Sequence, residues 1–395
     1  MNNPLSLKNT HSVSIARCRD YEATTIKSSL AEILKPLGGM NAFVKPGQRV
    51  ALKPNILMAA APERCICTHP QLVKAVGDLV KEAGGKPFII DSPGAAIPHK
   101  KSSLVRVYEK CGYAGLGIDM NEDEEYEFIP TRKGRIVKKV EICKPLLEAD
   151  AIINLPKVKT HSFMILTCAV KNMFGAVPGL LKIGYHSKLT SPDQFGAMLL
   201  DLLETVPPIL NIVDGVQGMD GEGPSGGNPR EMQVLLGSGD AVTLDYVVCK
   251  LIGFPPDKIP YLAIAQKEGI CSKDLSEIEI ISRESFESLC SPFQPPSTLS
   301  GQSRGGFAQR ILPFVRPMLN YTFTLSPRVD PEKCVGCGAC VRACPEKIIE
   351  LEERKGKPIA HIKRKGCIHC YCCHEMCPHK AISLHKSLPY RLLFS

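Results

Sequence analysis

The chain has 395 residues, 18 of them cysteine, and carries a formal net charge of +9. This length predicts about two domains, and an apolar fraction of 44% with 23% charged residues is typical of globular proteins and excludes a disordered chain. The longest apolar stretches are interrupted by charge and proline, which argues against a membrane span. The first residues show no signal-peptide or twin-arginine pattern, so we expect a cytoplasmic location.

Strand and helix patterns alternate along the first part of the chain. Strand patterns cover residues 49–56, 86–91, 150–158, 209–215 and 232–237, and helix patterns cover 68–85, 102–112, 191–206 and 240–253. In the first helix we expect Thr68 as the N-cap, Pro70 in the first turn, and Gly84 or Gly85 after its end. The alternation predicts an α/β fold in residues 1–290, with a mostly parallel sheet covered by helices.

The next segments connect this domain to a smaller one. Residues 291–306 are rich in proline, serine and glycine, a composition that predicts a linker. Residues 307–325 mix apolar and basic residues; a membrane-surface segment is one interpretation, and packing between the domains is the one we prefer. We therefore assign 291–325 to a linker and packing segment, 326–386 to a small domain, and 387–395 to a tail.

Two cysteine runs dominate the small domain. "KCVGCGACVRACP" at 333–345 and "GCIHCYCCHEMCP" at 366–378 both follow C-x2-C-x2-C-x3-C-P. In two-cluster ferredoxins the fourth cysteine of each run ligates the other cluster, so we expect two [4Fe-4S] clusters with crossed ligands. The expected ligands are Cys334, Cys337, Cys340 and Cys377 for cluster one, and Cys367, Cys370, Cys373 and Cys344 for cluster two. Zinc is the alternative, but eight cysteines in this spacing fit zinc poorly.

The two runs align without a gap, which indicates an internal repeat. Residues 348–365 between them alternate and turn as a hairpin would, so we expect a small α+β two-cluster ferredoxin-like domain. The alignment sets Cys372 opposite Ala339, a non-ligand position, and Tyr371 opposite Gly338. The ten cysteines outside the ligand set are interpreted as small buried hydrophobic residues: Cys18, Cys65, Cys67, Cys111, Cys143, Cys168, Cys249, Cys271, Cys290 and Cys372.

Polar side chains gather at and after the predicted strand ends. In a parallel sheet, ligands bind beyond the carboxyl ends of the strands, and lysine and histidine there can hold an anion and donate a proton. We therefore predict a pocket for a small anionic molecule. The candidate catalytic residues are Lys159, His161, Lys171 and His186. The candidate substrate-binding residues are Lys53, Asn55, Asp91, Ser92, Lys157, Thr160, Asn172 and Asp214. For any single lysine, a solvated surface position is the alternative.

Three other features have weaker interpretations. "GEGPSG" at 221–226 matches G-x-G-x-x-G, but it opens no helix and contains a proline, so we prefer a flexible loop over a site to a dinucleotide fingerprint. Cys65 and Cys67 could form a metal site or a redox pair, although an extended segment would point them to opposite faces. For His69, a local structural role and a functional role both stay open.

Several long motifs resemble one known family. They are "GGKPFIIDSPG", "INLPKVKTHSFMILTCAVKNMFGAVPG" and "NIVDGVQGMDGEGP", in this order, and they resemble the domain family of unknown function DUF362 over roughly residues 11–285. Members often carry a C-terminal two-cluster ferredoxin domain, so the resemblance implies an architecture and a redox theme but no particular reaction. Relatives tend to have a small residue where this chain has Cys67.

Three functional hypotheses follow. The first is an oxidoreductase that passes low-potential electrons through the clusters to a small, anionic substrate in the α/β domain. The second is an electron carrier whose large domain docks a partner oxidoreductase. The third, a nucleic-acid protein, is disfavoured because two oxidised clusters contribute about −4 and reduce the charge to about +5, and because tryptophan is absent.

Overall fold

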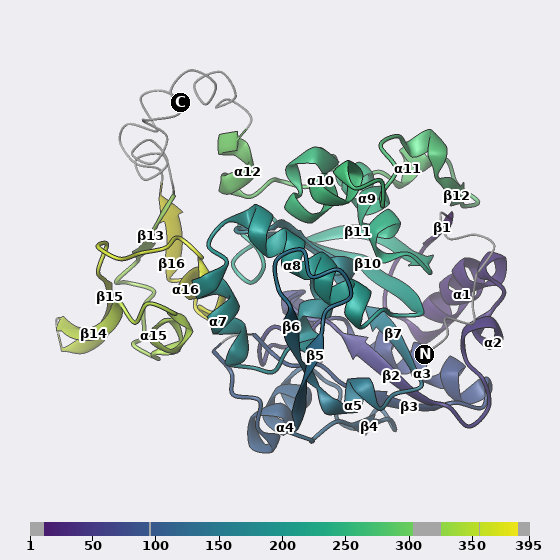
Figure 1. Ribbon diagram of the computed structural model, residues 1–395, viewed down its shortest axis with the longest axis horizontal. Coiled ribbons are helices and arrows are strands. Elements are labelled where there is room, and N and C mark those ends of the chain that lie inside the picture. Colours follow the sequence, from purple (N-terminus) through teal and green to yellow (C-terminus); the bar gives the residue numbers. More distant parts are fainter. Residues whose placement is uncertain (1–11, 95, 303–324, 355, 386–395) are drawn as a thin grey trace.

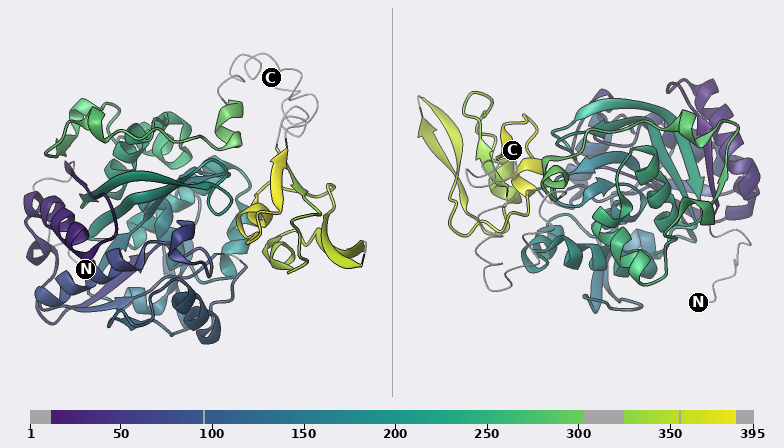
Figure 2. Two further views of the ribbon diagram at one scale, coloured as in Figure 1. Left: turned by 180° about the vertical axis from the view of Figure 1, so that it is seen from behind. Right: turned by 90° about the horizontal axis from the view of Figure 1, so that it is seen from above.

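The structure is a computed structural model that describes residues 12–94, 96–302, 325–354 and 356–385. Figures 1 and 2 show a large α/β domain and, beside it, a small domain formed by the C-terminal part of the described chain. The predicted packing segment at 307–325 and the tail at 387–395 lie outside the described residues, apart from Leu325. The N-terminal residues 1–11 also lie outside them.

A ten-stranded mixed sheet forms the centre of the large domain. Its main path, in spatial order, is β12 (Glu279–Ile281), β1 (Ser12–Arg17), β11 (Asn228–Ser238), β10 (Leu210–Asp220), β7 (Ala151–Leu155), β2 (Arg49–Pro54), β3 (Lys86–Ile89) and β4 (Asp119–Met120). Beside β10 lies β8 (Lys157–His161), which pairs in turn with β9 (Ile165–Thr167). The strands from β10 to β4 are parallel, whereas β11 runs antiparallel to both of its neighbours. The predicted α/β class with a mostly parallel sheet is therefore confirmed.

Helices cover both faces of this sheet. On one face pack α1 (Ala23–Leu34), α2 (Met40–Phe43), α3 (Pro70–Glu82) and α4 (Lys101–Lys110), and on the other α6 (Ala169–Asn172), α8 (Pro192–Thr205), α9 (Ala241–Leu251) and α10 (Pro260–Lys267). Successive side chains of a strand point to opposite faces of the sheet, so each strand contributes to both cores. In β2, Val50 and Leu52 join the core beneath α1 and α3, whereas Ala51 faces the core beneath α8.

Shorter elements complete the two domains. In the large domain they are β5 (Tyr126–Pro130), β6 (Lys139–Cys143), α5 (Lys144–Leu147), α7 (Leu181–Lys188), α11 (Phe286–Leu289) and α12 (Ser297–Gln302). In the small domain they are β13 (Ser326–Val329), α15 (Ala339–Ala343), β14 (Ile349–Arg354), β15 (Lys357–Ile362), α16 (Cys372–Glu375) and β16 (Ile382–His385). The antiparallel pair β14–β15 is the hairpin expected between the cysteine runs.

Two predicted elements differ in detail. The strand expected at 150–158 is interrupted at Pro156, which has no N–H to donate. Before it, β7 pairs with β10 and β2; after it, β8 still pairs with β10 but has β9 as its other neighbour. The predicted N-cap Thr68 is wrong. His69 caps α3 instead, because its Nδ1 accepts from the backbone N–H of Gln71, while the Thr68 hydroxyl donates to the carbonyl of Leu155.

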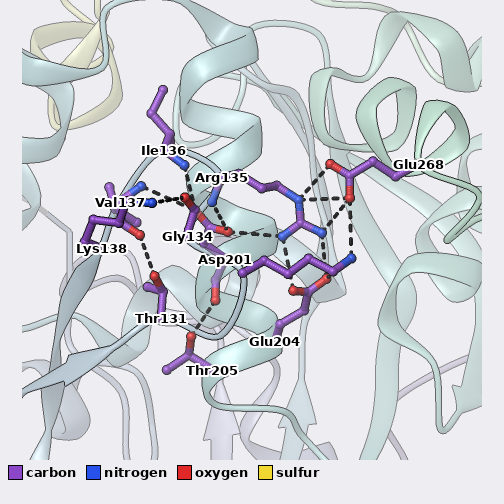
Figure 3. A network of polar contacts seen from close by, with 11 residues as sticks. Thr131, Gly134, Arg135, Ile136, Val137, Lys138, Asp201, Glu204, Thr205 and Glu268 are labelled. Carbon is purple, nitrogen blue, oxygen red and sulfur yellow. Dashed lines mark hydrogen bonds and ion pairs between the residues drawn. The ribbon is translucent and has the colours of Figure 1, made fainter.

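A half-buried arginine fixes the segment that leads into β6. Arg135 forms ion pairs with Asp201 and Glu204 on α8 and with Glu268 at the end of α10, at 3.1, 2.6 and 2.7 Å (Figure 3). Asp201 is fully buried and also accepts from the backbone N–H groups of Arg135 and Ile136. The pairing satisfies a carboxylate that would otherwise be costly to bury.

Candidate functional site

Three polar side chains form a row along β8. Lys157, Lys159 and His161 alternate with Val158 and Thr160, and side chains two residues apart on a strand share a face. Each member of this β8 row is 1% exposed. Because buried polar groups are costly without partners, the partners determine what the row can do.

At one end, the β8 row meets a buried carboxylate. Lys157 Nζ lies 3.0 Å from Asp214 Oδ2 and 2.7 Å from the hydroxyl of Tyr21, which donates to Asp214 Oδ1 at 2.8 Å. His69 stacks on Tyr21 with ring centroids 3.6 Å apart, and its backbone N–H donates to Asp214. Burial lowers the pKa of His69 to about 4, so the ring is neutral near pH 7. Tyr21 was not among the residues predicted from sequence.

The middle of the row holds a lysine with a perturbed proton affinity. Lys159 Nζ donates to the carbonyl of Ile66 at 2.6 Å. Burial lowers the pKa of Lys159 to about 7, with Cys67 opposing this effect and the charges of Lys171 and Lys157 adding to it. Lys159 can therefore gain or lose a proton near neutral pH.

At the other end, His161 faces the small domain. Its Nδ1 accepts from the backbone N–H groups of Phe163 and Met164, so the neutral ring carries its proton on Nε2. Nε2 lies 3.2 Å from Glu375 Oε1, without hydrogen-bond alignment. Burial lowers the pKa of His161 well below its ordinary value, and the charge on Lys171 acts in the same direction.

Glu375 belongs to the second cysteine run and was missed by the sequence analysis. It ends α16, between Cys373 and Cys377, and it is 7% exposed. Burial raises the pKa of Glu375 to about 7, while the charges of Lys171 and Lys159 counteract the shift. The signal that could have found it is an acidic residue at the position where the first run has Arg342.

The loop at 221–226 holds α16 against β8. Gly223 accepts from the backbone N–H of Ser162 and donates to the Thr160 hydroxyl, and a Cβ at Gly223 would lie 2.2 Å from the Thr160 carbonyl oxygen. On its other side, the loop's Ser225 hydroxyl donates to the Glu375 carbonyl at 2.6 Å. The expectation of a flexible loop is therefore wrong, because hydrogen bonds fix the segment from both domains.

The candidate residues at the end of β2 and just after β3 form a separate buried ion pair. Lys53 Nζ lies 2.7 Å from Asp91 Oδ1, and Asp91 Oδ2 accepts from the backbone N–H of Ile56. A Cβ at Gly175 would fall 1.8 Å from Asp91 Oδ1, so only glycine fits there. Lys182, a residue that the sequence analysis did not select, donates to the carbonyl of Ser92, and burial lowers its pKa to about 7.

The remaining candidates lie between these groups. Asn172 donates to Asn154 Oδ1 and to the Lys53 carbonyl, and its own Oδ1 has no partner among the described residues. The side-chain oxygen of Asn55 is likewise buried without a partner there. His186 stacks on Phe195, and burial lowers its pKa to about 3, so it is a neutral ring in an aromatic environment.

Four cysteines of the small domain line one cavity. Cys334, Cys337, Cys340 and Cys377 are among its lining residues, and these are the four cysteines that the motif spacing assigns to one cluster. Burial raises the pKa of Cys340 to about 11, and the charge of Cys377 acts in the same direction. A thiolate donor set around such a cavity fits a cubane cluster.

The second run has a matching arrangement. Burial raises the pKa of Cys373, with Cys370, Cys367 and Cys344 as the main neighbouring thiols. Among the residues that the structure describes, no three His, Cys, Asp or Glu side chains converge closely enough to hold a single metal ion. Four cysteine thiols in each set are the donor type that ligates a [4Fe-4S] cluster.

Left-handed backbone positions repeat in register between the two runs. Gly336 and Gly338 have φ of 67° and 71°, and the equivalent His369 and Tyr371 have φ of 54° and 62°. Such angles are costly for residues with a Cβ, so the second loop is held in this shape by its surroundings. Tyr371 is 7% exposed, which indicates that packing supplies this constraint.

The two cysteine runs differ in exposure. In the first, Cys337 is exposed, and Val335 and Leu351 beside it are 55% and 43% exposed. In the second, Cys370, Cys372 and Cys373 are buried. Of the cysteines interpreted as buried hydrophobic residues, Cys290 is exposed and contradicts that interpretation, because it lies at the surface end of α11.

Comparison with known proteins identifies both domains. Residues 50–250 match a domain of unknown function, DUF362, and residues 333–381 match a 4Fe-4S dicluster domain. A thylakoid-associated protein of Synechocystis sp. is 38% identical over 266 residues, which is 66% of this chain and 80% of that protein. Ferredoxin-2 of Desulfomicrobium norvegicum is 50% identical over 30 residues, 8% of this chain and 51% of that ferredoxin.

Among solved structures, the lactate racemase apoprotein of Thermoanaerobacterium thermosaccharolyticum aligns with a TM-score of 0.39 and 13% identity. The alignment covers 62% of this chain and 58% of that one, so less than two thirds of either. Among the described residues, none of the helices is both long and apolar enough to cross a membrane.

Proposed function

Because this chain belongs to the DUF362 family and carries a 4Fe-4S dicluster domain, its role includes iron-sulfur electron transfer, and we propose that it is a reductase whose acceptor site lies along the β8 row. The observation that carries this proposal is the position of Glu375. This residue of the second cysteine run is buried in the large domain, 3.2 Å from His161. The second run and the candidate acceptor site are thus in contact.

We propose that two [4Fe-4S] clusters bind, one to each crossed ligand set. The first set is Cys334, Cys337, Cys340 and Cys377, and the second is Cys367, Cys370, Cys373 and Cys344. When bound, these clusters supply one-electron transfer. The difference in exposure supports a direction, with the external donor docking near Val335 and Leu351 and the second run facing the acceptor site.

The residues of the site have distinct proposed tasks. Lys159 and Lys171 attract a small anionic substrate, since Lys159 is buried, Lys171 is half-buried, and neither has a carboxylate within ion-pair distance among its described contacts. The Nε2–H of His161 can donate a hydrogen bond to a substrate that displaces Glu375. Lys157 and Asp214 fix the far end of the row, and His186 contributes an aromatic wall.

The second candidate is an electron carrier whose large domain docks a partner. The burial of the β8 row favours it, because a substrate must open the site before it can bind. The apolar side chains around Cys337 would serve a partner protein equally well.

One anaerobic measurement separates the two candidates. The cluster-loaded chain is reduced, and its visible absorbance is followed after adding small-molecule or protein fractions of a cell extract. A reductase recovers absorbance with the small-molecule fraction, loses this in Lys159→Ala, and keeps it in the exposed control Lys188→Ala. Recovery with the protein fraction alone would refute the reductase and support the carrier.

A further inference from the structure

Two cysteines outside the iron-sulfur motifs meet inside the large domain. Cys67 Sγ and Cys111 Sγ lie 3.6 Å apart, and each also lies 3.5 Å from the carbonyl oxygen of Met58. They are 44 residues apart in the sequence, and they are 4% and 1% exposed. The sequence analysis considered Cys67 only with Cys65, whose Sγ instead approaches Gln217 Oε1 at 3.4 Å.

The two sulfur atoms lie close to the distance at which a disulfide bond forms. A disulfide has an S–S distance of about 2.05 Å, so the two sulfurs must approach by about 1.5 Å. Cys111 follows the last turn of α4 and precedes Gly112 (φ 81°), and Cys67 lies in the loop before α3. Neither side chain sits in the middle of a rigid element, so a small rearrangement suffices.

The two thiols are electrostatically different. Hydrogen bonding from Cys111 lowers the pKa of Cys67 to about 7, with burial opposing the effect and Lys159 adding to it. Interaction with Cys67 raises the pKa of Cys111. The pair thus combines one readily formed thiolate with one protonated thiol, the combination that thiol–disulfide chemistry uses.

Burial restricts how this pair can exchange electrons. An external thiol or disulfide must reach a sulfur atom to react, and both sulfurs are enclosed. Electrons need no such access. Cys67, Cys111 and Met58 share one apolar core with Cys370 and Met376 of the second cysteine run. The domains are in tight contact there, since a Cβ at Gly94 would lie 2.8 Å from both Met376 Sδ and the Leu57 carbonyl.

We propose that Cys67 and Cys111 form a reversible disulfide whose reduced, dithiol form holds two electrons for the acceptor site. These electrons come from the second cysteine run, and this electron route rests on the function proposed above. In reduction, the S–S bond accepts one electron, a second electron and two protons follow, and two thiols result. In oxidation, a small anionic acceptor that takes two electrons receives them, two protons leave, and the S–S bond forms. The pair thereby converts one-electron delivery into a two-electron reaction.

The test maps the thiols of the full cluster-loaded chain. Samples are poised anaerobically at a series of potentials, quenched in acid, unfolded, alkylated and digested. We expect a linked Cys67–Cys111 peptide that disappears as the potential falls, while the buried controls Cys143 and Cys249 stay alkylatable throughout. Cys111→Ser should abolish the linked peptide without changing the iron content. If Cys67 and Cys111 are fully alkylated at every potential in samples of the chain that retain their iron, the disulfide is refuted.

A second arm tests the route. Cys367→Ser is expected to lose one cluster. Dithionite should then reduce the Cys67–Cys111 disulfide at least tenfold more slowly than in the unaltered chain, as measured by the loss of the linked peptide after digestion. An unchanged rate in the variant would overturn the feed from the second run but leave the disulfide standing. Failure of the electron route is therefore distinguishable from failure of the dithiol pair itself.

Discussion

Glu375 and Arg342 occupy equivalent positions in the two cysteine runs, yet Glu375 is buried against His161 of the large domain whereas Arg342 is exposed on the small one. At this position the second run therefore packs against the large domain, whereas the first run faces solvent. This asymmetry is what gives the two runs different proposed tasks.

The first prediction concerns this contact. Glu375→Ala removes a buried side chain from the contact with His161 and leaves a cavity between the two domains, so we expect a loss of about 1–3 kcal/mol in stability. Anaerobic thermal denaturation measures it, with Arg342→Ala as the control at the equivalent position. Equal effects of the two substitutions would contradict a special role for Glu375.

The second prediction concerns ligand crossing. Cys334→Ala and Cys377→Ala should abolish the same cluster although the residues belong to different runs, because both line one cavity. Each variant should retain about half of the iron, with identical electron paramagnetic resonance of the remaining cluster. Cys372→Ala should retain all of the iron. Different residual spectra for the first two variants would contradict the crossing.

The third prediction concerns pH. The pKa of Lys159 is about 7 in the folded chain and ordinarily 10.5, so between these values the unfolded chain binds more protons. The contribution of Lys159 to the unfolding free energy therefore rises with pH across this window, by at most about 1.4 kcal/mol per pH unit. Below about pH 7 the lysine is charged in both states, and the full burial cost is present.

Lys159→Met removes this dependence. The difference in unfolding free energy, unaltered chain minus variant, should increase from pH 7 to pH 9.5. Denaturant titrations at several pH values measure it, and the exposed Lys188→Met supplies the control. A flat difference would show that Lys159 keeps an ordinary pKa.

The fourth prediction concerns the buried pair of Lys53 and Asp91. Lys53→Met should destabilise the fold by about 3–5 kcal/mol because an unpaired carboxylate remains buried, whereas the double substitution Lys53→Met/Asp91→Leu should recover part of this loss. Recovery would indicate that the pair is structural. If the double variant is no more stable than Lys53→Met, Asp91 has a role beyond pairing.

The fifth prediction concerns Arg135. Arg135→Met leaves Asp201 buried without its guanidinium partner, so we expect a loss of about 3 kcal/mol in stability with unchanged iron content. The neighbouring exposed Arg132→Met should change stability by less than about 0.5 kcal/mol. Comparable losses in both variants would argue against the ion pairs as the cause.

Local patterns sufficed for part of the fold and of the site. Helix α3 follows from its apolar spacing with Pro70 at the start and Gly84 after the end, and the β14–β15 hairpin follows from alternation around a turn. The cap of α3 was misassigned because Thr68 and His69 are both competent and only the partner of Thr68, Leu155, decides between them. Patterns in sequence do not carry that information.

Inspection along the chain was enough to find the two cysteine motifs, the alternation of strands and helices, and the lysines at strand ends, because each depends on residues close together in the chain. Which of these residues meet depends on the packing of the fold. Tyr21 reaches Asp214 across 193 residues, Cys67 meets Cys111, and Glu375 enters the large domain beside His161. Such pairs are set by how the sheet and the two domains pack, since burial and hydrogen bonding act between neighbours in space.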